Sequence, residues 1–396
     1  MDPRYLIVLC AAMTQFMVIG GMFAYSVFFT VLEDELGWSR TLLSGASSLA
    51  FLVMGILAIV AGALSDRYGP RWVLSVTGIV TGLGWMLLAG MNQPWQLLLG
   101  FGFCVGVGLS SHDVATLSLV ASWFEKRRGL MTGIVKSGTA VGQMLMPLVV
   151  SIWVLSFGWR TAMFILGAVS VVVLLIAAQG MRRPPATEQL RRSGGAESKT
   201  SGMTWEQARR SRTLWALCAI QFCFFSSLMA VPVHLVAYAT DMGLSTTKAA
   251  GVLSLVGGCS IAGRLCIGFL IDQWGGRRSM LMCFVPLLCS LVALRLADDP
   301  GWLFLIAPVY GFAHGGLFTV VSPTVAEFFG MRAHGALFGT ILFFGTLGGA
   351  AGPLVTGMIF DSQGSYSLAF TGLAVSVAIG LVLVTSLPRF ARRNAN

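Results

Sequence analysis

Arg264 has the residue type and the position of an anion-binding group. It lies inside an apolar segment, about two helical turns before Asp272, with no acidic residue within one turn on the same segment. An ionisable side chain at such a depth in a membrane costs roughly 2.5 kcal/mol or more unless it is paired or hydrated. A guanidinium group donates two parallel hydrogen bonds to one carboxylate, so Arg264 is our first candidate for binding an organic anion. The alternative is a structural arginine bound to backbone carbonyls or to an acid on another helix.

A second group of ionisable residues consists of His112, Asp113 and Lys136. Asp113 is the one carboxylate that we place deep within an apolar segment, and Lys136 lies at a comparable depth in the next segment, counted from the turn at 124–130. One hypothesis is an Asp113–Lys136 ion pair that neutralises both charges. The other makes Asp113 or His112 the group that carries a proton and Lys136 a second attractor for the anion.

Several polar residues inside the apolar segments are weaker candidates for lining a binding site. Each has a hydrogen-bonding side chain, and the direction in which it faces depends on how the helices pack. We assign the stronger of them to substrate binding: Tyr25, Gln143, Tyr310 and His314. Gln15, Gln221 and His234 are further candidates of the same kind.

The composition requires that these residues be carried by membrane-spanning helices. The chain is 56% hydrophobic and 11% charged, against about 25% charged residues in a soluble domain. Its apolar segments are about 20 residues or longer, which favours α-helices over the strands of a barrel. We predict twelve spans: 5–32, 41–65, 71–91, 95–123, 130–156, 159–181, 213–240, 246–271, 278–297, 301–327, 335–360 and 366–387.

The positive net charge of +10 comes mainly from the N-terminus, alternate loops, the segment 182–212 and the C-terminal tail. This distribution predicts that both termini are cytoplasmic. No basic cluster is interleaved with aromatic residues on a soluble module, so we expect no nucleic-acid partner. No Cys-x-x-Cys and no Cys–His cluster of metal-binding spacing occurs, so we expect no metal or cofactor.

The two halves of the chain repeat one pattern at a constant offset of 206 residues. The loop Gly62-Ala-Leu-Ser-Asp-Arg-Tyr-Gly-Pro-Arg71 returns as Gly268-Phe-Leu-Ile-Asp-Gln-Trp-Gly-Gly-Arg277. The offset also relates Gly37 to Gly243, Gly45 to Gly251, Gly129 to Gly335, Gly133 to Gly339 and Pro147 to Pro353. We therefore predict two six-helix bundles, 1–181 and 213–396, joined by a cytoplasmic linker, 182–212. Two membrane-embedded copies of one unit are typical of a carrier with its substrate site between the copies.

The repeated loop resembles that of the major facilitator superfamily, which carries Gly-x-x-x-Asp-Arg-x-Gly-x-Arg between its second and third spans. The resemblance covers nearly the whole chain and implies an all-α membrane protein of twelve helices in two pseudo-symmetric bundles. It also implies a conformational latch rather than a substrate contact for the charged loop residues. These are Asp66, Arg67, Arg71, Asp272 and Arg277. We expect Asp66 to accept hydrogen bonds from the N-terminus of a neighbouring helix.

Three further features resemble the monocarboxylate-porter and oxalate/formate-exchanger branch of that superfamily. They are Gly37-Trp-Ser-Arg, Thr204-Trp-Glu-Gln-Ala and Gly263-Arg264-Leu. In that branch the residue similar to Arg264 holds the substrate carboxylate. This chain departs from the branch at Ser260, where animal carriers have an aspartate, and in 335–360, which contains no second cation.

The sequence thus favours proton-coupled symport of a small monocarboxylate, such as lactate, pyruvate or an aromatic acid, by rocking of the two bundles. No nucleotide-binding loop of the Gly-x-x-x-x-Gly-Lys-Ser/Thr type occurs, so ATP-driven transport is not expected. Anion exchange, proton-driven efflux of lipophilic compounds and a membrane sensor without transport are the alternatives. We expect no enzymatic activity, a monomer, and a location in the cytoplasmic membrane.

Overall fold

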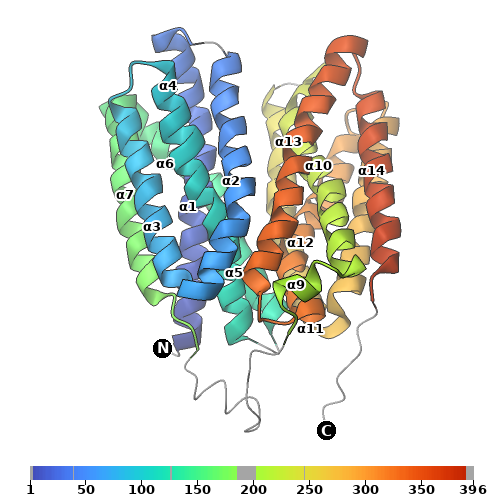
Figure 1. The fold of residues 1–396 in the computed structure, drawn as a ribbon. Helices are drawn as coiled ribbons and strands as arrows, with labels where there is room; N and C mark the ends of the chain where they lie inside the picture. Colours follow the sequence, from blue (N-terminus) through green and yellow to red (C-terminus); the bar gives the residue numbers. More distant parts are fainter. Residues whose placement is uncertain (1–2, 39, 125–126, 185–201, 245, 389–396) are drawn as a thin grey trace. The chain divides into compact units, whose positions relative to one another are not determined.

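The computed structural model describes residues 3–38, 40–124, 127–184, 202–244 and 246–388, and these residues form helices joined by short turns (Figure 1). In the described residues the only pairing of strand type is one isolated bridge between Gly202 and Gly330. The helices are α1 (Pro3–Leu36), α2 (Arg40–Tyr68), α3 (Pro70–Ala89), α4 (Pro94–Leu97), η1 (Leu98–Val105), α5 (Gly106–Trp123), α6 (Arg128–Phe157), α7 (Trp159–Gly180), α9 (Trp205–Ala208), α10 (Arg212–Asp241), α11 (Thr246–Leu296), α12 (Trp302–Phe329), α13 (His334–Gln363) and α14 (Ser367–Ser386).

Helix α11 contains two of the predicted spans. At about 1.5 Å per residue its 51 residues would be far longer than a bilayer core of about 30 Å. Gly275 breaks it with φ 77° and ψ 170°, so the chain turns there and continues as a second helix. The described residues hold eleven helices long and apolar enough to cross a membrane, and the break in α11 brings the number of spans to the predicted twelve.

The fourth span is continuous but not uniform. Pro94 begins it, and the side chains of Gln93 and Gln96 form a capping box with the backbone at its N-terminus. Residues Leu98–Val105 then follow in a π-helical stretch before the regular helix α5. Helix α5 is buried along nearly its whole length and carries both His112 and Asp113, so the fold places these residues in protein rather than in lipid.

The repeat is visible in the backbone. Six of the eight glycines with positive φ angles in the described residues form pairs that are 206 positions apart. The pairs are Gly37 and Gly243, Gly69 and Gly275, and Gly158 and Gly364. Each pair marks the same inter-helix turn in the two copies, so the copies share turn geometry as well as sequence.

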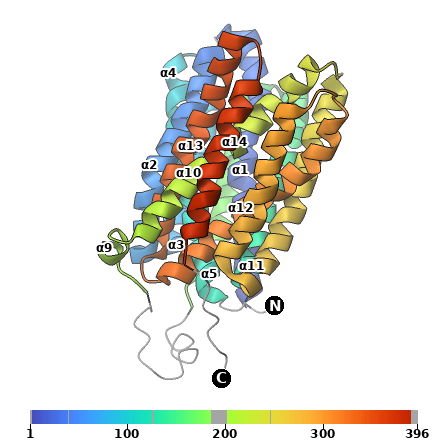
Figure 2. The ribbon, with the colours of Figure 1, turned by 90° about the vertical axis from the view of Figure 1, so that its right-hand side faces the viewer.

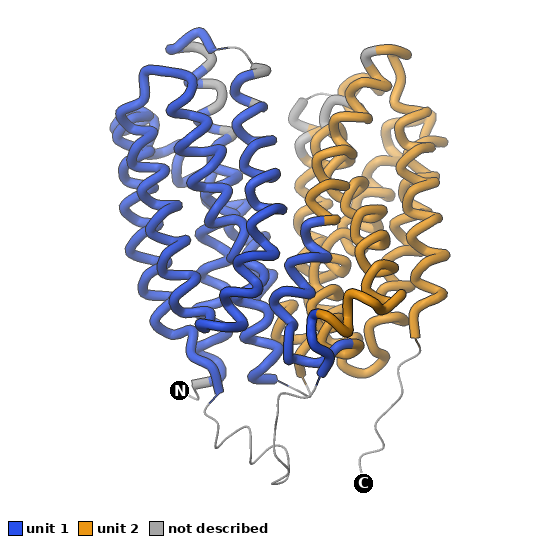
Figure 3. Tube along the Cα trace, in the orientation of Figure 1, with its two compact units in different colours: residues 1–125, 134–205, 329–343 blue, residues 126–133, 206–328, 344–396 orange. Residues whose placement is uncertain are grey.

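By contacts the chain divides into two compact units, coloured in Figure 3. Unit 1 comprises 1–125, 134–205 and 329–343; unit 2 comprises 126–133, 206–328 and 344–396. The start of α6 is therefore grouped with the second copy, and the start of α13 with the first. Most of the predicted linker, 185–201, lies outside the described residues.

Glycines bring the helices that carry the candidate residues into backbone contact. In unit 1 a Cβ on Gly138 or Gly142 would overlap the carbonyl oxygen of Ala12 or Phe16, so α6 lies directly against α1. In membranes small residues of this kind permit the close approach on which helix association depends.

The same device operates in unit 2. A Cβ on Gly311 or Gly315 of α12 would overlap the carbonyl oxygen of Val256 or Ser260 of α11. Figure 2 shows these two helices side by side in unit 2. Arg264 is one turn beyond Ser260, so its backbone is fixed against α12.

The outward-facing side chains of the helices are apolar. Leu155 is 87% exposed and Trp72 68% exposed, and many other large apolar side chains are similarly placed. Only lipid can solvate such a surface. The chain is thus an all-helical, multi-pass membrane protein.

Candidate functional site

Asp113 and Lys136 form a buried ion pair in unit 1. The Lys136 Nζ atom lies 2.6 Å from Asp113 Oδ1 and 2.8 Å from Oδ2, and the two residues are 3% and 6% exposed. The pair joins α5 to α6. The ion-pair hypothesis drawn from the sequence is confirmed in its geometry. The role of Asp113 or His112 as the proton carrier stays a prediction.

Gln15 of α1 connects this ion pair to the surrounding hydroxyl groups. Its Nε2 atom donates to Asp113 Oδ1 at 2.8 Å and to Thr116 Oγ1 at 3.1 Å. Its Oε1 atom accepts from Thr139 Oγ1 at 2.9 Å. Gln15 is 0% exposed, so these contacts replace water completely at its amide.

His112 lies beside the ion pair but is turned toward its own helix. Its Nδ1 atom is 2.5 Å from the carbonyl oxygen of Leu109, which can only accept, so Nδ1 carries the hydrogen. Its Nε2 atom is 3.6 Å from Asp113 Oδ1. His112 therefore lies next to the Asp113 carboxylate without a hydrogen bond to it, and the choice between Asp113 and His112 as the proton carrier stays a prediction.

Arg264 is buried in unit 2, on α11. It is 2% exposed, and its guanidinium carbon lies 5.6 Å from the ring centroid of Phe318 on α12. An aromatic face at this distance stabilises a cation. Ser260, the residue that replaces an aspartate of the animal carriers, lies one turn before Arg264 and is hydrogen-bonded to His314 Nδ1 at 3.3 Å.

Tyr310, His314 and Phe318 form an aromatic row at four-residue spacing on α12. The ring centroids of His314 lie 5.9 Å from Tyr310 and 5.0 Å from Phe318. The Tyr310 hydroxyl donates to the carbonyl oxygen of Ser227 at 2.9 Å. The row places His314 close enough to Arg264 for the two to interact electrostatically, whereas the hydroxyl of Tyr310 joins α12 to α10. The assignment of both residues to substrate binding stays a prediction.

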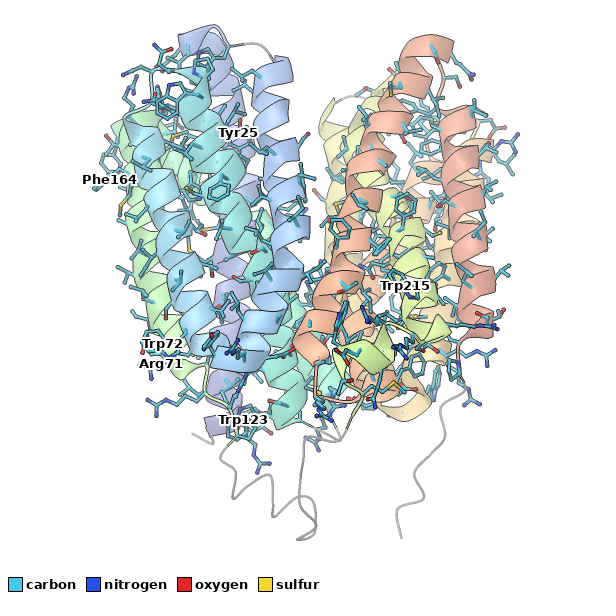
Figure 4. All side chains as sticks on the ribbon, viewed as in Figure 1. Tyr25, Arg71, Trp72, Trp123, Phe164 and Trp215 are labelled. Carbon is cyan, nitrogen blue, oxygen red and sulfur yellow. The ribbon has the colours of Figure 1, made fainter. Side chains whose placement is uncertain are left out.

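The other sequence candidates have structural partners or lie apart from these clusters. The Tyr25 hydroxyl donates to the carbonyl oxygen of Leu43, and its ring stacks on Phe101 at 3.8 Å (Figure 4 labels Tyr25). Gln143 is exposed on α6. His234 Nε2 lies 3.0 Å from the carbonyl oxygen of Pro353.

The two aspartates of the repeated loop make the same contact in the two copies. The Asp66 carboxylate accepts from the backbone N–H groups of Gly335 and Ala336, at 3.2 and 3.0 Å, where α13 begins. The Asp272 carboxylate accepts from Gly129 and Leu130, at 2.7 and 3.1 Å, where α6 begins. Each aspartate thus caps a helix N-terminus, where N–H groups lack intrahelical partners. The expectation for Asp66 is confirmed, and Asp272 repeats it 206 residues later.

The arginines of the loop are also related by the repeat. Arg71 donates to the side chain of Gln179 at the end of α7, and Figure 4 labels Arg71 beside Trp72 where α3 begins. Arg277 donates to the carbonyl oxygen of Thr385, 206 residues after Gln179, at 2.6 Å. Arg67 lies over the ring of its neighbour Tyr68, 5.1 Å from the centroid.

Two charged residues that contact these loops were not predicted from the sequence. Arg183 donates to the carbonyl oxygens of Ser65 and Asp66 at the end of α2. Glu327 Oε2 accepts from the N–H of Gly276 at 2.7 Å. The repeat itself held the signal for Glu327, because the first copy has Pro70, which has no N–H, at the position of Gly276.

Twelve apolar spans in two copies, with buried charges confined to a few positions, define the class of membrane-embedded carriers. The model of the Major Facilitator Superfamily matches residues 11–297 and 259–396, so the chain belongs to this superfamily and is a transporter, not an enzyme. Monocarboxylate transporter 13 of Bos taurus is 26% identical over 390 residues, covering 98% of this chain and 89% of the relative. The agnestins efflux protein AgnL12 of Paecilomyces divaricatus is 25% identical over 395 residues, covering 97% and 88%.

Among solved structures, the transporter FucP in its outward conformation resembles this chain with a TM-score of 0.78 at 16% identity. The match covers 98% of this chain and 99% of FucP. At this identity the likeness shows the fold alone. The relative named as a monocarboxylate transporter agrees with the branch to which Gly263-Arg264-Leu pointed.

Proposed function

We propose that this protein is a proton-coupled symporter of a small monocarboxylate and that Arg264 binds the carboxylate. The observation that carries the proposal is a guanidinium group buried within the protein, on the helix face that α12 covers with His314 and Phe318. The similarity to a monocarboxylate transporter over almost the whole chain supports the same substrate class.

In the proposed substrate site Arg264 provides the charge and α12 provides the shape. A guanidinium fork matches the two oxygens of one carboxylate, whereas an ammonium group would bind as a point charge. The Phe318 ring limits the space beside the guanidinium group. Ser260 and His314 supply further hydrogen-bonding groups one turn away.

In the proposed proton site Asp113 is the group that is protonated. Its carboxylate is stabilised by Lys136 and by Gln15, and protonation would remove the charge that Lys136 balances. His112, with its Nε2 atom 3.6 Å from Asp113 Oδ1, is the titratable neighbour of this carboxylate. A buried ion pair loses several kcal/mol when one partner is neutralised, roughly 3–5 kcal/mol, which is enough to bias a conformational equilibrium.

Transport would proceed by rocking of residues 1–181 against 213–396, with the aspartate caps at Gly335 and Gly129 holding one of the two conformations. We further propose that the protein works as a monomer in the cytoplasmic membrane with both termini in the cytoplasm. The basic loops support this orientation.

The test is uptake of a panel of radiolabelled monocarboxylates into proteoliposomes, with and without an inward proton gradient. We expect gradient-stimulated uptake by the wild-type protein and its loss in Arg264→Ala. Arg295→Ala, at the end of the second helix of α11, beyond the break at Gly275, is the control and should retain uptake. Normal uptake by folded Arg264→Ala would contradict the carboxylate assignment. Uptake that ignores the gradient and requires an internal anion would indicate exchange.

Proton-driven efflux is the second candidate function, because one relative is named as an efflux protein and is similar over nearly the full length. In that case folded protein would take up none of the acids in the panel. It would instead extrude a lipophilic compound when a proton gradient is applied, and Asp113→Asn would abolish this extrusion.

A further inference from the structure

We infer that Gln15 is a positioning residue for the proton site: it holds the Asp113 carboxylate in its ionised, Lys136-paired form rather than contacting substrate. The inference rests on the proposed function of Asp113 and deepens it. It also replaces the sequence-based interpretation of Gln15 as a donor in the substrate site, because every polar atom of its amide already has a partner.

The direction of each hydrogen bond around Gln15 follows from its neighbours. The Thr116 hydroxyl donates to the carbonyl oxygen of His112, so the Thr116 Oγ1 atom must accept from Gln15 Nε2. The Asp113 carboxylate can also only accept while it is ionised. The two hydrogens of the amide are thereby directed to Asp113 and Thr116, and the carbonyl oxygen of His112 is a third, longer acceptor at 3.3 Å from Nε2.

The remaining atom of the amide is held from α6. Oε1 accepts from the Thr139 hydroxyl, so the amide is held on both sides, with its nitrogen toward Asp113 and its oxygen toward Thr139. Thr139 lies three residues after Lys136, so one helix supplies both the cation and the residue that orients Gln15. Gln15 thus stabilises ionised Asp113 with a charge-assisted hydrogen bond that a protonated carboxyl group would not need.

The groups that interact with Asp113 in the described residues come from three helices. Lys136 of α6 contributes the positive charge, His112 of α5 is the titratable neighbour, and Gln15 of α1 is the uncharged donor. Removing Gln15 therefore leaves the charges unchanged and removes only the orienting hydrogen bond. Removing Gln15 should therefore raise the proton affinity of Asp113 moderately.

The repeat supplies a matched control. Gln221 stands 206 residues after Gln15, is likewise buried at 2% exposed, and lies on the corresponding helix α10. At the positions of Asp113, Lys136 and Thr139 the second copy has Thr319, Leu342 and Gly345. A Cβ on Gly345 would overlap the Gln221 side chain, so Gln221 fills space where Gln15 orients a carboxylate.

The experiment is an infrared titration of the protonated carboxyl band in purified protein, a measurement that needs no knowledge of the substrate. Asp113→Asn identifies the component that belongs to Asp113. In Gln15→Leu we expect this component to persist to a pH about one unit higher, because a tenfold change in proton affinity corresponds to one unit. Gln221→Leu should leave the titration unchanged.

A titration midpoint in folded Gln15→Leu equal to that of the wild type would overturn the inference, as would equal shifts in Gln15→Leu and Gln221→Leu. If Gln15→Leu does not fold, Thr139→Val provides the second test. This variant keeps Gln15 but removes the hydrogen bond to its Oε1 atom, so a smaller shift of the Asp113 titration midpoint in the same direction is expected. No shift would also overturn the inference. Wild-type symport by Asp113→Asn would instead refute the proposed proton site and leave the titration result standing.

Discussion

The charged cluster of unit 1 and the Arg264 cluster of unit 2 can be compared residue by residue, because the repeat relates positions that are 206 residues apart. Asp113 and Lys136 of the first copy correspond to Thr319 and Leu342 of the second. Arg264 of the second copy corresponds to Ala58 of the first, and both are buried, at 2% and 1% exposed. Each copy therefore keeps a buried charge at a position where the other has a neutral residue.

The loops show the opposite behaviour. Asp66 and Asp272 cap helix N-termini through equivalent backbone groups, and Arg71 and Arg277 reach equivalent residues. The two copies thus agree at the contacts of the charged loop and differ where a charge is buried in the membrane. Because a buried charge is costly, its retention in only one copy points to a task other than packing.

The largest effect on transport is expected for Arg264→Lys. Lysine keeps the charge but loses the planar fork, so a site that holds a carboxylate by two parallel hydrogen bonds should lose uptake by about 100-fold or more. Monocarboxylate uptake in proteoliposomes measures the effect. The control is Ala58→Ser at the corresponding position of the first copy, which should retain uptake. Uptake by Arg264→Lys within a few-fold of wild type would show that charge alone suffices.

The contributions of Asp113 and Lys136 to stability should depend on each other. Asp113→Asn or Lys136→Met alone leaves one charge buried and should lower the free energy of unfolding by about 3–5 kcal/mol. The double variant removes both charges and should recover most of this loss without recovering proton-driven uptake. Thermal unfolding in detergent compares the three. Thr319→Val, at the corresponding position of the second copy, should be nearly neutral; a double variant less stable than both single ones would contradict the model.

The glycine contacts should respond equally in the two copies. A Cβ on Gly62 would overlap the carbonyl oxygen of Gly335, and one on Gly268 that of Gly129. Gly62→Ala and Gly268→Ala should therefore each lower stability by about 1–3 kcal/mol. Gly45 and Gly251, with nothing near their Cβ positions, are the controls: alanine there should be neutral or stabilising by up to about 1 kcal/mol. An effect confined to one copy would break the equivalence.

The smallest expected effect is that of the helix caps. In Asp66→Asn and Asp272→Asn a neutral amide with one acceptor oxygen replaces a carboxylate that accepts one backbone hydrogen bond on each oxygen, which should lower stability by about 1 kcal/mol. The two variants should agree within about 0.5 kcal/mol in thermal unfolding. A clearly larger loss in one of them would show that the two caps are not equivalent.

Much of the fold followed from patterns that physical chemistry makes unambiguous. Long apolar segments predict helices in lipid, and the offset of Asp66 from Asp272 predicted the paired turns that Gly69 and Gly275 form. The break at Gly275 could be placed because only glycine adopts that backbone conformation readily. The contact of Asp66 with a helix N-terminus was predicted in kind, but its partners Gly335 and Ala336 were not, because 269 and 270 residues separate them from it.

The sequence by itself determined the class of this protein, the helices and the small set of buried charges, because a charged residue inside an apolar segment can be recognised from the sequence alone. The sequence offered the Asp113–Lys136 ion pair as one of two hypotheses, and the tertiary structure decided that these two charges meet. Asp113 and Lys136 pair between α5 and α6, and Gln15 reaches Asp113 because glycines of α6 allow α1 to pack directly against it. Helical facing depends on packing between segments far apart in the chain, and a pattern of residue types along one segment does not contain it.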